Sequence, residues 1–138
     1  EGDTFSPRMA TTRGMVVTML ARLDGVSTKG SDPWYKAGME WAVRNGITTR
    51  TNANSPIARE EIVEMMWKFA GAPFVRGDYL AGFPDANKVS ASAEEAMNWA
   101  VAVGLVEGTG NGLEPKGETC RDELATLFMR LCTDVLDL

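Results

Sequence analysis

The sequence predicts an all-α protein built from helix-turn-helix repeats, and three observations support this fold class. Apolar residues recur at helical spacing, whereas sustained two-residue alternation typical of strands is missing from the sequence. The segment WAVRNGI at 41–47 recurs 58 positions later as WAVAVGL. An arginine opens an apolar helical pattern three times, at Arg13, Arg59 and Arg121. Together these features indicate self-similar helical units.

The recurring pattern divides the chain into two full units and an incomplete one. We expect residues 1–25 to be the C-terminal half of a first repeat, residues 26–79 to be the second repeat with its connector, and residues 80–138 to be the third repeat. Each unit ends with an arginine and an apolar helix. The first unit lacks the front half that the other two share.

The first helix is predicted to begin after a threonine N-cap, either Thr11 or Thr12, and to run to about Asp24. Gly25 follows, and glycine adopts the left-handed conformation that ends helices. We expect residues 1–7 to form a turn ahead of this helix.

The second and third helices are predicted from their prolines, since proline is favoured in the first helical turn. The second is expected to run from about Pro33 to Asn45. The third is expected to open at Ser55 and Pro56 and to end at about Ala70. These two helices and the polar turn between them form most of the second unit.

Two helices are expected in the last part of the chain, at about 91–103 and 119–135, after a connector at 71–88. Cys120 and Cys132 are 12 positions apart. On one helix this spacing separates them by roughly 18 Å, which is too far for a disulfide. We expect both to be free thiols packed in the core.

Composition excludes several classes of function. The net charge of −5 argues against a nucleic-acid partner, which requires a clustered basic face. No apolar run is long enough to span a membrane. Because the chain contains no histidine, it has no histidine-based triad and no histidine-ligated metal. We therefore expect a binding module rather than an enzyme, without a metal or other cofactor.

The third unit, GFPDANKVSASAEEAMNWAVAVGLVEGTGNGLEPKGETCRDELATLFMRL, resembles the S-layer homology (SLH) domain. The resemblance extends over most of the chain. It implies helical repeats, usually three, arranged around a pseudo-threefold axis. It also implies that the domain holds an exported bacterial protein to the cell wall without a covalent bond. In that family the ligand is a secondary cell-wall polysaccharide, often bound in grooves between repeats.

The family signature is a Thr-Arg-Ala-Glu tetrapeptide, which reads here as Thr-Arg-Gly-Met, Ala-Arg-Glu-Glu and Cys-Arg-Asp-Glu. The resemblance implies that Arg13, Arg59 and Arg121 bind the acidic sugar. Threonine at the N-cap and glutamate three residues later form a capping box, which places the arginine at the positive end of the helix. No copy keeps both capping residues, although Ser55 and Thr119 offer caps from a shifted start.

Two further residues are candidates for the glycan site. Trp34 lies near a predicted helix start beside a polar loop, where an indole ring is placed to stack on a sugar. Asp85 corresponds to the aspartate of the family's Phe-x-Asp opening. For the arginines an alternative stays open, in which each one bridges a neighbouring carboxylate such as Glu61 or Glu123 instead of a ligand.

The function predicted from the sequence is non-covalent anchoring of an exported protein at the bacterial cell surface, through an anionic cell-wall polysaccharide. The alternative is a protein-interaction module on the same scaffold, with eroded glycan motifs. In that case a protein partner or a second copy completes the first repeat. An apolar face left uncovered by the incomplete unit favours association.

Overall fold

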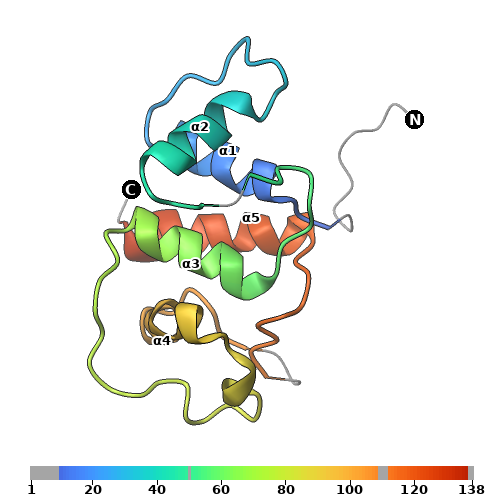
Figure 1. The fold of residues 1–138 in the computed structure, drawn as a ribbon. Helices are drawn as coiled ribbons and strands as arrows, with labels where there is room; N and C mark the ends of the chain where they lie inside the picture. Colours follow the sequence, from blue (N-terminus) through green and yellow to red (C-terminus); the bar gives the residue numbers. More distant parts are fainter. Residues whose placement is uncertain (1–9, 50, 109–111, 137–138) are drawn as a thin grey trace.

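The computed structural model describes residues 10–49, 51–108 and 112–136, and it is helical (Figure 1). The predicted turn at residues 1–7 lies outside these ranges. The elements are α1 (Arg13–Leu23), α2 (Lys36–Arg44), α3 (Arg59–Phe69), the 3-10 turns η1 (Ala86–Lys88) and η2 (Ala91–Ala93), α4 (Glu94–Ala102), α5 (Arg121–Arg130) and the π-helical turn η3 (Leu131–Val135). The described residues contain only isolated β-bridges and no strand, and the all-α prediction is confirmed.

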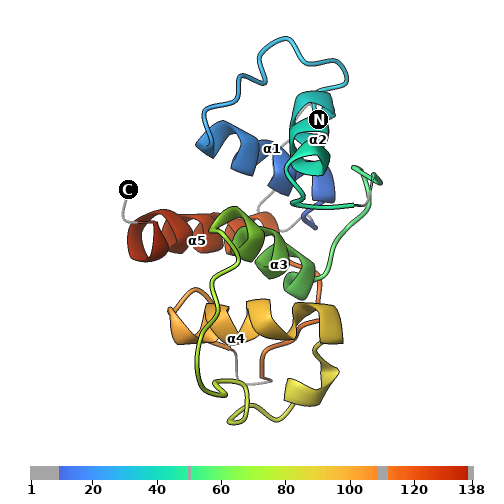
Figure 2. The ribbon, with the colours of Figure 1, turned by 60° about the vertical axis from the view of Figure 1, so that its left-hand side comes forward.

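The helices pack in pairs around a shared core. The short helix α2 packs across α1, and the short helix α4 packs across α3, while α5 lies beside α3 (Figures 1 and 2). Two of the helices that begin at the motif arginines, α1 and α3, supply most of the largest fully buried apolar side chains. These are Val16, Val17, Leu20, Ile62, Val63, Met65 and Met66. Burial of these side chains is the main stabilising contribution to the fold.

Three short extended segments, one ahead of each arginine helix, join the units in a cycle. In each pair, the residue directly before one motif arginine bridges to the residue three positions before another motif arginine. The pairs are Thr12 with Pro56, Ala58 with Glu118, and Cys120 with Ala10. The first unit thus contacts the second, the second contacts the third, and the third contacts the first. The arrangement of whole repeats around a pseudo-threefold axis stays a prediction.

The predicted start of the third helix is wrong, because its residues belong to this cycle. Instead of beginning at Pro56, α3 begins at Arg59. The Ile57 N–H donates to the carbonyl of Thr11 at 3.3 Å, so this segment bonds to a neighbouring chain segment rather than within a helix. The expected cap from Ser55 is therefore not formed.

The start of the second helix is also later than predicted. α2 begins at Lys36 and not at Pro33. The hydroxyl of Ser31, which lies ahead of the proline, accepts a hydrogen bond from the Ala37 N–H at 3.1 Å. A side chain outside the helix thus satisfies one of the unpaired N–H groups of the first turn.

The helix caps follow the capping-box geometry with unusual residues. Thr12 is the N-cap of α1, as predicted, and its hydroxyl accepts from the Met15 N–H at 3.4 Å. The Met15 sulfur accepts from the Thr12 N–H at 3.4 Å, in the place of the expected glutamate. At α5 the Cys120 N–H donates to Glu123 at 3.1 Å. The predicted cap from Thr119 is wrong, since this residue is buried and outside the helix.

Both cysteines are free, as predicted, but their expected position in the core is wrong. Cys120 and Cys132 are each half-buried. Cys120 is the N-cap of α5, where a helix end reaches the surface, and Cys132 lies in η3 on the outer side of the same helical segment. Neither thiol is therefore part of the packed apolar interior.

The close crossing of α1 and α2 depends on Gly38, and its replacement is a first test of the fold. A Cβ atom at Gly38 would lie 2.7 Å from Oγ1 and 2.8 Å from Cα of Thr18. We expect Gly38→Ala to lower the free energy of unfolding by about 1–3 kcal/mol, measured by urea denaturation, despite the higher helix propensity of alanine. Gly82→Ala is the control, because a Cβ there meets nothing within 4 Å. Equal stability of the two variants would contradict the close crossing.

Candidate functional site

The first motif arginine, Arg13, is held in a buried ion pair with the second unit. Its Nε and Nη2 atoms donate to the two carboxylate oxygens of Glu61 at 2.7 and 3.0 Å. Its Nη1 donates to the carbonyl of Asn52 at 2.7 Å. The two side chains of the ion pair are only 5% and 16% exposed. The guanidinium of Arg13 therefore joins two units and is largely closed to solvent.

Arg59 makes the corresponding contacts with the third unit in a more open setting. Its Nη2 donates to Glu123 at 2.7 Å, and its Nη1 donates to the carbonyl of Glu114 at 3.0 Å. The Arg59 side chain is 11% exposed, but its partner Glu123 is 46% exposed. A single hydrogen bond to a half-exposed carboxylate holds a guanidinium less firmly than the two-point contact of Arg13.

The third motif arginine, Arg121, is half-buried at the first position of α5. In units two and three, the residue two positions after the motif arginine is a glutamate, Glu61 or Glu123. Each glutamate accepts hydrogen bonds from the motif arginine of the preceding unit. The same position in unit one is Met15, whose thioether has no charge. The cycle of interunit arginine–glutamate pairs seen for Arg13 and Arg59 therefore lacks a carboxylate at this place.

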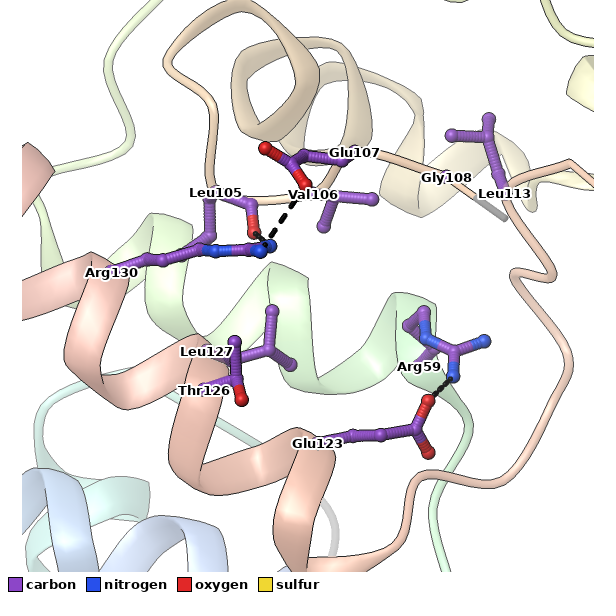
Figure 3. Close-up of a pocket in the computed structure, with 10 residues that line it drawn as sticks. All are labelled: Arg59, Leu105, Val106, Glu107, Gly108, Leu113, Glu123, Thr126, Leu127 and Arg130. Atoms are coloured by element: carbon purple, nitrogen blue, oxygen red, sulfur yellow. Dashed lines mark hydrogen bonds and ion pairs between the residues drawn. The ribbon is translucent and has the colours of Figure 1, made fainter. Parts of the chain in front are cut away.

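A groove lies between α5 and residues 105–108 and 113, and Figure 3 shows the residues that line it. Its volume is about 220 Å³. Arg59 and Arg130 lie toward opposite ends of the groove, and the apolar side chain of Leu127 lies between them (Figure 3). The groove thus offers two guanidinium groups from two different helices, separated by an apolar surface.

Arg130 is the functional candidate that the sequence analysis did not select. Its Nη1 donates to the carbonyl of Leu105, and its Nη2 donates to Glu107, both at 3.2 Å. The Glu107 side chain is 70% exposed, so this ion pair is a surface pair of about 0–1 kcal/mol that an anion can replace. The available signal was a basic residue nine positions after each motif arginine, namely Arg22, Lys68 and Arg130.

A second groove occupies the equivalent place on α3, beside residues 47–49, and it has a different charge. Its lining includes the three carboxylates of Glu60, Glu61 and Glu64 against the two ammonium groups of Lys68 and Lys116. Lys116 pairs with Glu60 at 2.7 Å, and Lys68 pairs with Glu64 at 3.6 Å. Three carboxylates face two ammonium groups here, whereas the groove of Figure 3 has two carboxylates and two guanidinium groups, so this groove is less suited to an anion.

Residues 82–125 match the family model of the S-layer homology domain. This segment is similar to the S-layer homology domain. It contains the groove residues 105–108, Leu113 and Glu123, while Arg59 and Arg130 lie on either side of the match. No curated protein sequence matches the chain. An SLH domain is a cell-wall anchoring module, which associates the protein that carries it with the bacterial cell surface.

The described ranges contain neither a membrane-spanning helix nor a cluster of metal ligands. None of the helices there is long and apolar enough to cross a membrane. Within the same ranges, no group of three or more His, Cys, Asp or Glu residues is placed to hold a metal ion.

Trp34, the predicted sugar-stacking residue, is 50% exposed at the start of the second unit. Its ring packs edge-on against Tyr35 at a centroid distance of 5.3 Å. It is not part of the lining of either groove described above. The structure therefore places Trp34 on the protein surface, apart from the groove of Figure 3.

Asp85, the other predicted glycan contact, is buried and bonded to the backbone. Its two oxygens accept from the N–H groups of Leu113 at 2.9 Å and Glu114 at 2.8 Å. The hydrogen bond from Leu113 is the largest cause that holds the pKa of Asp85 below its ordinary value. Because the Glu114 carbonyl in turn accepts from Arg59, Asp85 supports one wall of the SLH groove and acts on the guanidinium through the backbone.

Two glutamates at the contacts between units also have lowered pKa values. Burial alone raises the pKa of Glu60, but hydrogen bonds from Lys116 and Ser90 lower it further than burial raises it. For Glu123 burial again opposes the shift, and the Cys120 N–H together with the charge of Arg59 lowers the pKa. Both groups are therefore stabilised as carboxylates in the folded protein.

These shifts predict a loss of stability in acid. Because the pKa values of Glu60, Asp85 and Glu123 are lower in the folded state, the unfolded chain takes up protons first as the pH falls. The free energy of unfolding should hold its full value above about pH 5 and decrease progressively below about pH 4. Urea denaturation at a series of pH values measures this, and equal stability at neutral pH and at about pH 3 would contradict it.

Proposed function

We propose that this protein anchors an exported bacterial protein to the cell wall by binding an anionic secondary cell-wall polysaccharide in the groove of Figure 3. The observation that carries the proposal is the pair of guanidinium groups, Arg59 and Arg130, at the two ends of a groove in an SLH domain. In this proposal the protein acts by binding and not by catalysis, and it needs no cofactor.

The chemistry of the groove suits an acidic sugar. A guanidinium has five N–H donors, and the hydrogen bonds from Arg59 to Glu123 and Glu114 use two of them. A ligand carboxylate placed at either end gains charge-assisted hydrogen bonds, which are about twice as strong as neutral ones. Between the ends, Leu127 offers an apolar surface to the C–H face of a sugar ring (Figure 3).

The other residues predicted from the sequence have different roles in the proposed binding. Arg13 is the weaker candidate for direct contact, because Glu61 binds it at two points. Arg121 and Trp34 remain proposed contacts for neighbouring sugar units of a longer polymer. Asp85 is proposed as a positioning residue for Arg59. The repeat boundaries at 1–25, 26–79 and 80–138 belong to the same proposal.

The test compares two arginines at equivalent repeat positions, Arg130 in the groove and Arg22 on the exposed surface of α1. We expect Arg130→Gln to weaken binding to purified bacterial cell walls by about tenfold or more, measured by co-sedimentation, because a desolvated charge contact is lost. Arg22→Gln should bind as the unchanged protein does. Chemical removal of the secondary polysaccharide should abolish binding of all three proteins.

Two results of this experiment would contradict the proposal. Binding that is the same for Arg130→Gln and Arg22→Gln would remove the groove from the proposal. Binding that survives removal of the polysaccharide would remove the ligand. Circular dichroism of each variant shows that a loss of binding does not come from unfolding, since both side chains lie on the outside of their helices.

One observation favours the alternative, in which the scaffold is a protein-interaction module. Arg13 and Arg59 already have carboxylate partners in Glu61 and Glu123, so these arginines hold units together without a ligand. A folded protein that ignores intact cell walls would support this second function.

A further inference from the structure

The chain between α3 and η1 passes alongside α4 (Figures 1 and 2), and it is held there at two points. At the first point, the indole N–H of Trp67 in α3 donates to the carbonyl of Pro73 at 2.9 Å. At the second, the side-chain amide of Asn98 in α4 donates to the carbonyl of Gly77 at 2.9 Å and accepts from the Tyr79 N–H at 2.6 Å. The residues between these two points are therefore held in place beside α4.

The segment between the two points, residues 74–76, has an unpaired backbone edge. Residues 72–76 form neither a turn nor a bend. Within the described residues, the N–H and carbonyl groups of Phe74, Val75 and Arg76 take part in no hydrogen bond. Such groups along a straight segment are the edge to which another polypeptide strand adds through main-chain hydrogen bonds.

A groove of about 360 Å³ lies between this segment and α4. Its apolar lining comes from Phe74, Val75 and Leu80. Leu80 is buried, whereas the Phe74 side chain is 76% exposed. Because the chain is held on both sides of Phe74, this exposed ring is an apolar surface that needs little further ordering when a ligand binds.

The charged lining of this groove is entirely acidic. Asp78 comes from the chain before η1, and Glu94 and Glu95 are the first two residues of α4. None of these three carboxylates forms an ion pair with another described residue. Arg76 is exposed and is not part of the lining. The two grooves described above share no lining residue with this one, and both of them contain cations.

We propose that this acidic groove docks an extended, basic polypeptide segment of a partner protein, with lysines at alternate positions. Alternate side chains of a strand point to the same face, so the lysines approach the three carboxylates together. Their aliphatic stems pack on Phe74 and Val75, while the main chain of the segment pairs with the edge of residues 74–76. Charge complementarity selects a basic segment over a neutral or acidic one. This docking does not depend on polysaccharide binding.

The probe is a fluorescently labelled peptide in which lysines alternate with threonines, since threonine favours extended structure. It is titrated with the whole chain at physiological ionic strength and followed by fluorescence anisotropy. We expect saturable binding to the unchanged protein. Phe74→Ser should bind at least about tenfold more weakly through loss of the apolar contact. The double variant Glu94→Gln with Glu95→Gln should show a decrease of the same size through loss of the charge contact.

Each of these protein variants has a matched control. Glu118→Gln with Asp122→Asn removes two exposed carboxylates at the start of α5, and so changes the net charge by the same amount. Val43→Ser replaces an exposed apolar residue of α2 that lies outside the groove. Both controls should bind the peptide as the unchanged protein does.

Altered probes test the proposed occupant itself. A peptide with methylated backbone amides should bind at least about tenfold more weakly, because it has lost its main-chain donors. The proposal is overturned if the alternating peptide does not bind, or if its affinity is unchanged by the methylation or by both groove variants. It is also overturned if a peptide with the same lysines in one block binds equally well, because net charge alone then explains the binding. Equally tight binding of spermidine would overturn it too, since the occupant would then be a small cation.

Discussion

Removing one carboxylate should cost this protein a large part of its stability. We expect Glu61→Ala to lower the free energy of unfolding by about 3 kcal/mol or more, measured by urea denaturation. The Arg13 side chain is 5% exposed and makes two hydrogen bonds to Glu61. Without Glu61 the guanidinium keeps its charge in a buried site, with the Asn52 carbonyl as its remaining acceptor among the contacts described above.

The comparison for this variant comes from the same helix. Glu64→Ala removes a carboxylate that pairs with Lys68 at 3.6 Å on the outer side of α3, and it should change stability by no more than about 0.5 kcal/mol. A double variant with methionine at positions 13 and 61 should recover most of the loss, since the buried charge is then absent. If Glu61→Ala is as stable as Glu64→Ala, the ion pair between Arg13 and Glu61 does not hold the units together.

The second large effect is expected at Asp85. Asp85→Asn should lower the free energy of unfolding by about 2–3 kcal/mol, because an amide replaces the charge and turns a donor toward one of the two N–H groups. The hydrogen bonds affected are those that the N–H groups of Leu113 and Glu114 donate to the carboxylate of Asp85. Since the Glu114 carbonyl accepts from Arg59, cell-wall binding should weaken as well.

Acid titration separates this effect from general destabilisation. The lowered pKa of Asp85 makes the folded state more stable above the pH at which the carboxyl is protonated. Asp85→Asn should therefore show a shallower decrease of unfolding free energy between about pH 4 and pH 2. Asp78→Asn is the control, because Asp78 accepts a single 3.2 Å hydrogen bond in an exposed loop. An unchanged pH profile for Asp85→Asn would contradict the structural role.

Much of the fold was predictable from local patterns. The apolar spacing identified each helix, and Thr12 and Gly25 marked the two ends of the first one, with Gly25 at a φ of 88°. The errors arose where distant segments meet. Pro56 fits the first turn of a helix equally well, but the bridge between Thr12 and Pro56 keeps it extended, and no local signal shows this pairing.

The site was harder to predict for a related reason. The motif arginines could be located from the sequence, but their partners are 48 and 64 positions away along the chain. Whether a guanidinium is closed off, as in Arg13, or open, as in Arg59, depends on the exposure of that distant carboxylate. Arg130 was missed because its helical periodicity does not show that it turns toward residues 105–107.

The cycle of bridges among the three extended segments also affects how the chain folds. An open solenoid grows one repeat at a time, with stability that adds between neighbours. Here Thr11 donates to the carbonyl of Thr119 at 2.7 Å, so the first motif reaches the last across most of the polypeptide. Loops of this length must close before their contacts stabilise anything. The units therefore depend on one another. During synthesis, residues up to at least Cys120 must leave the ribosome before the cycle of bridges can form.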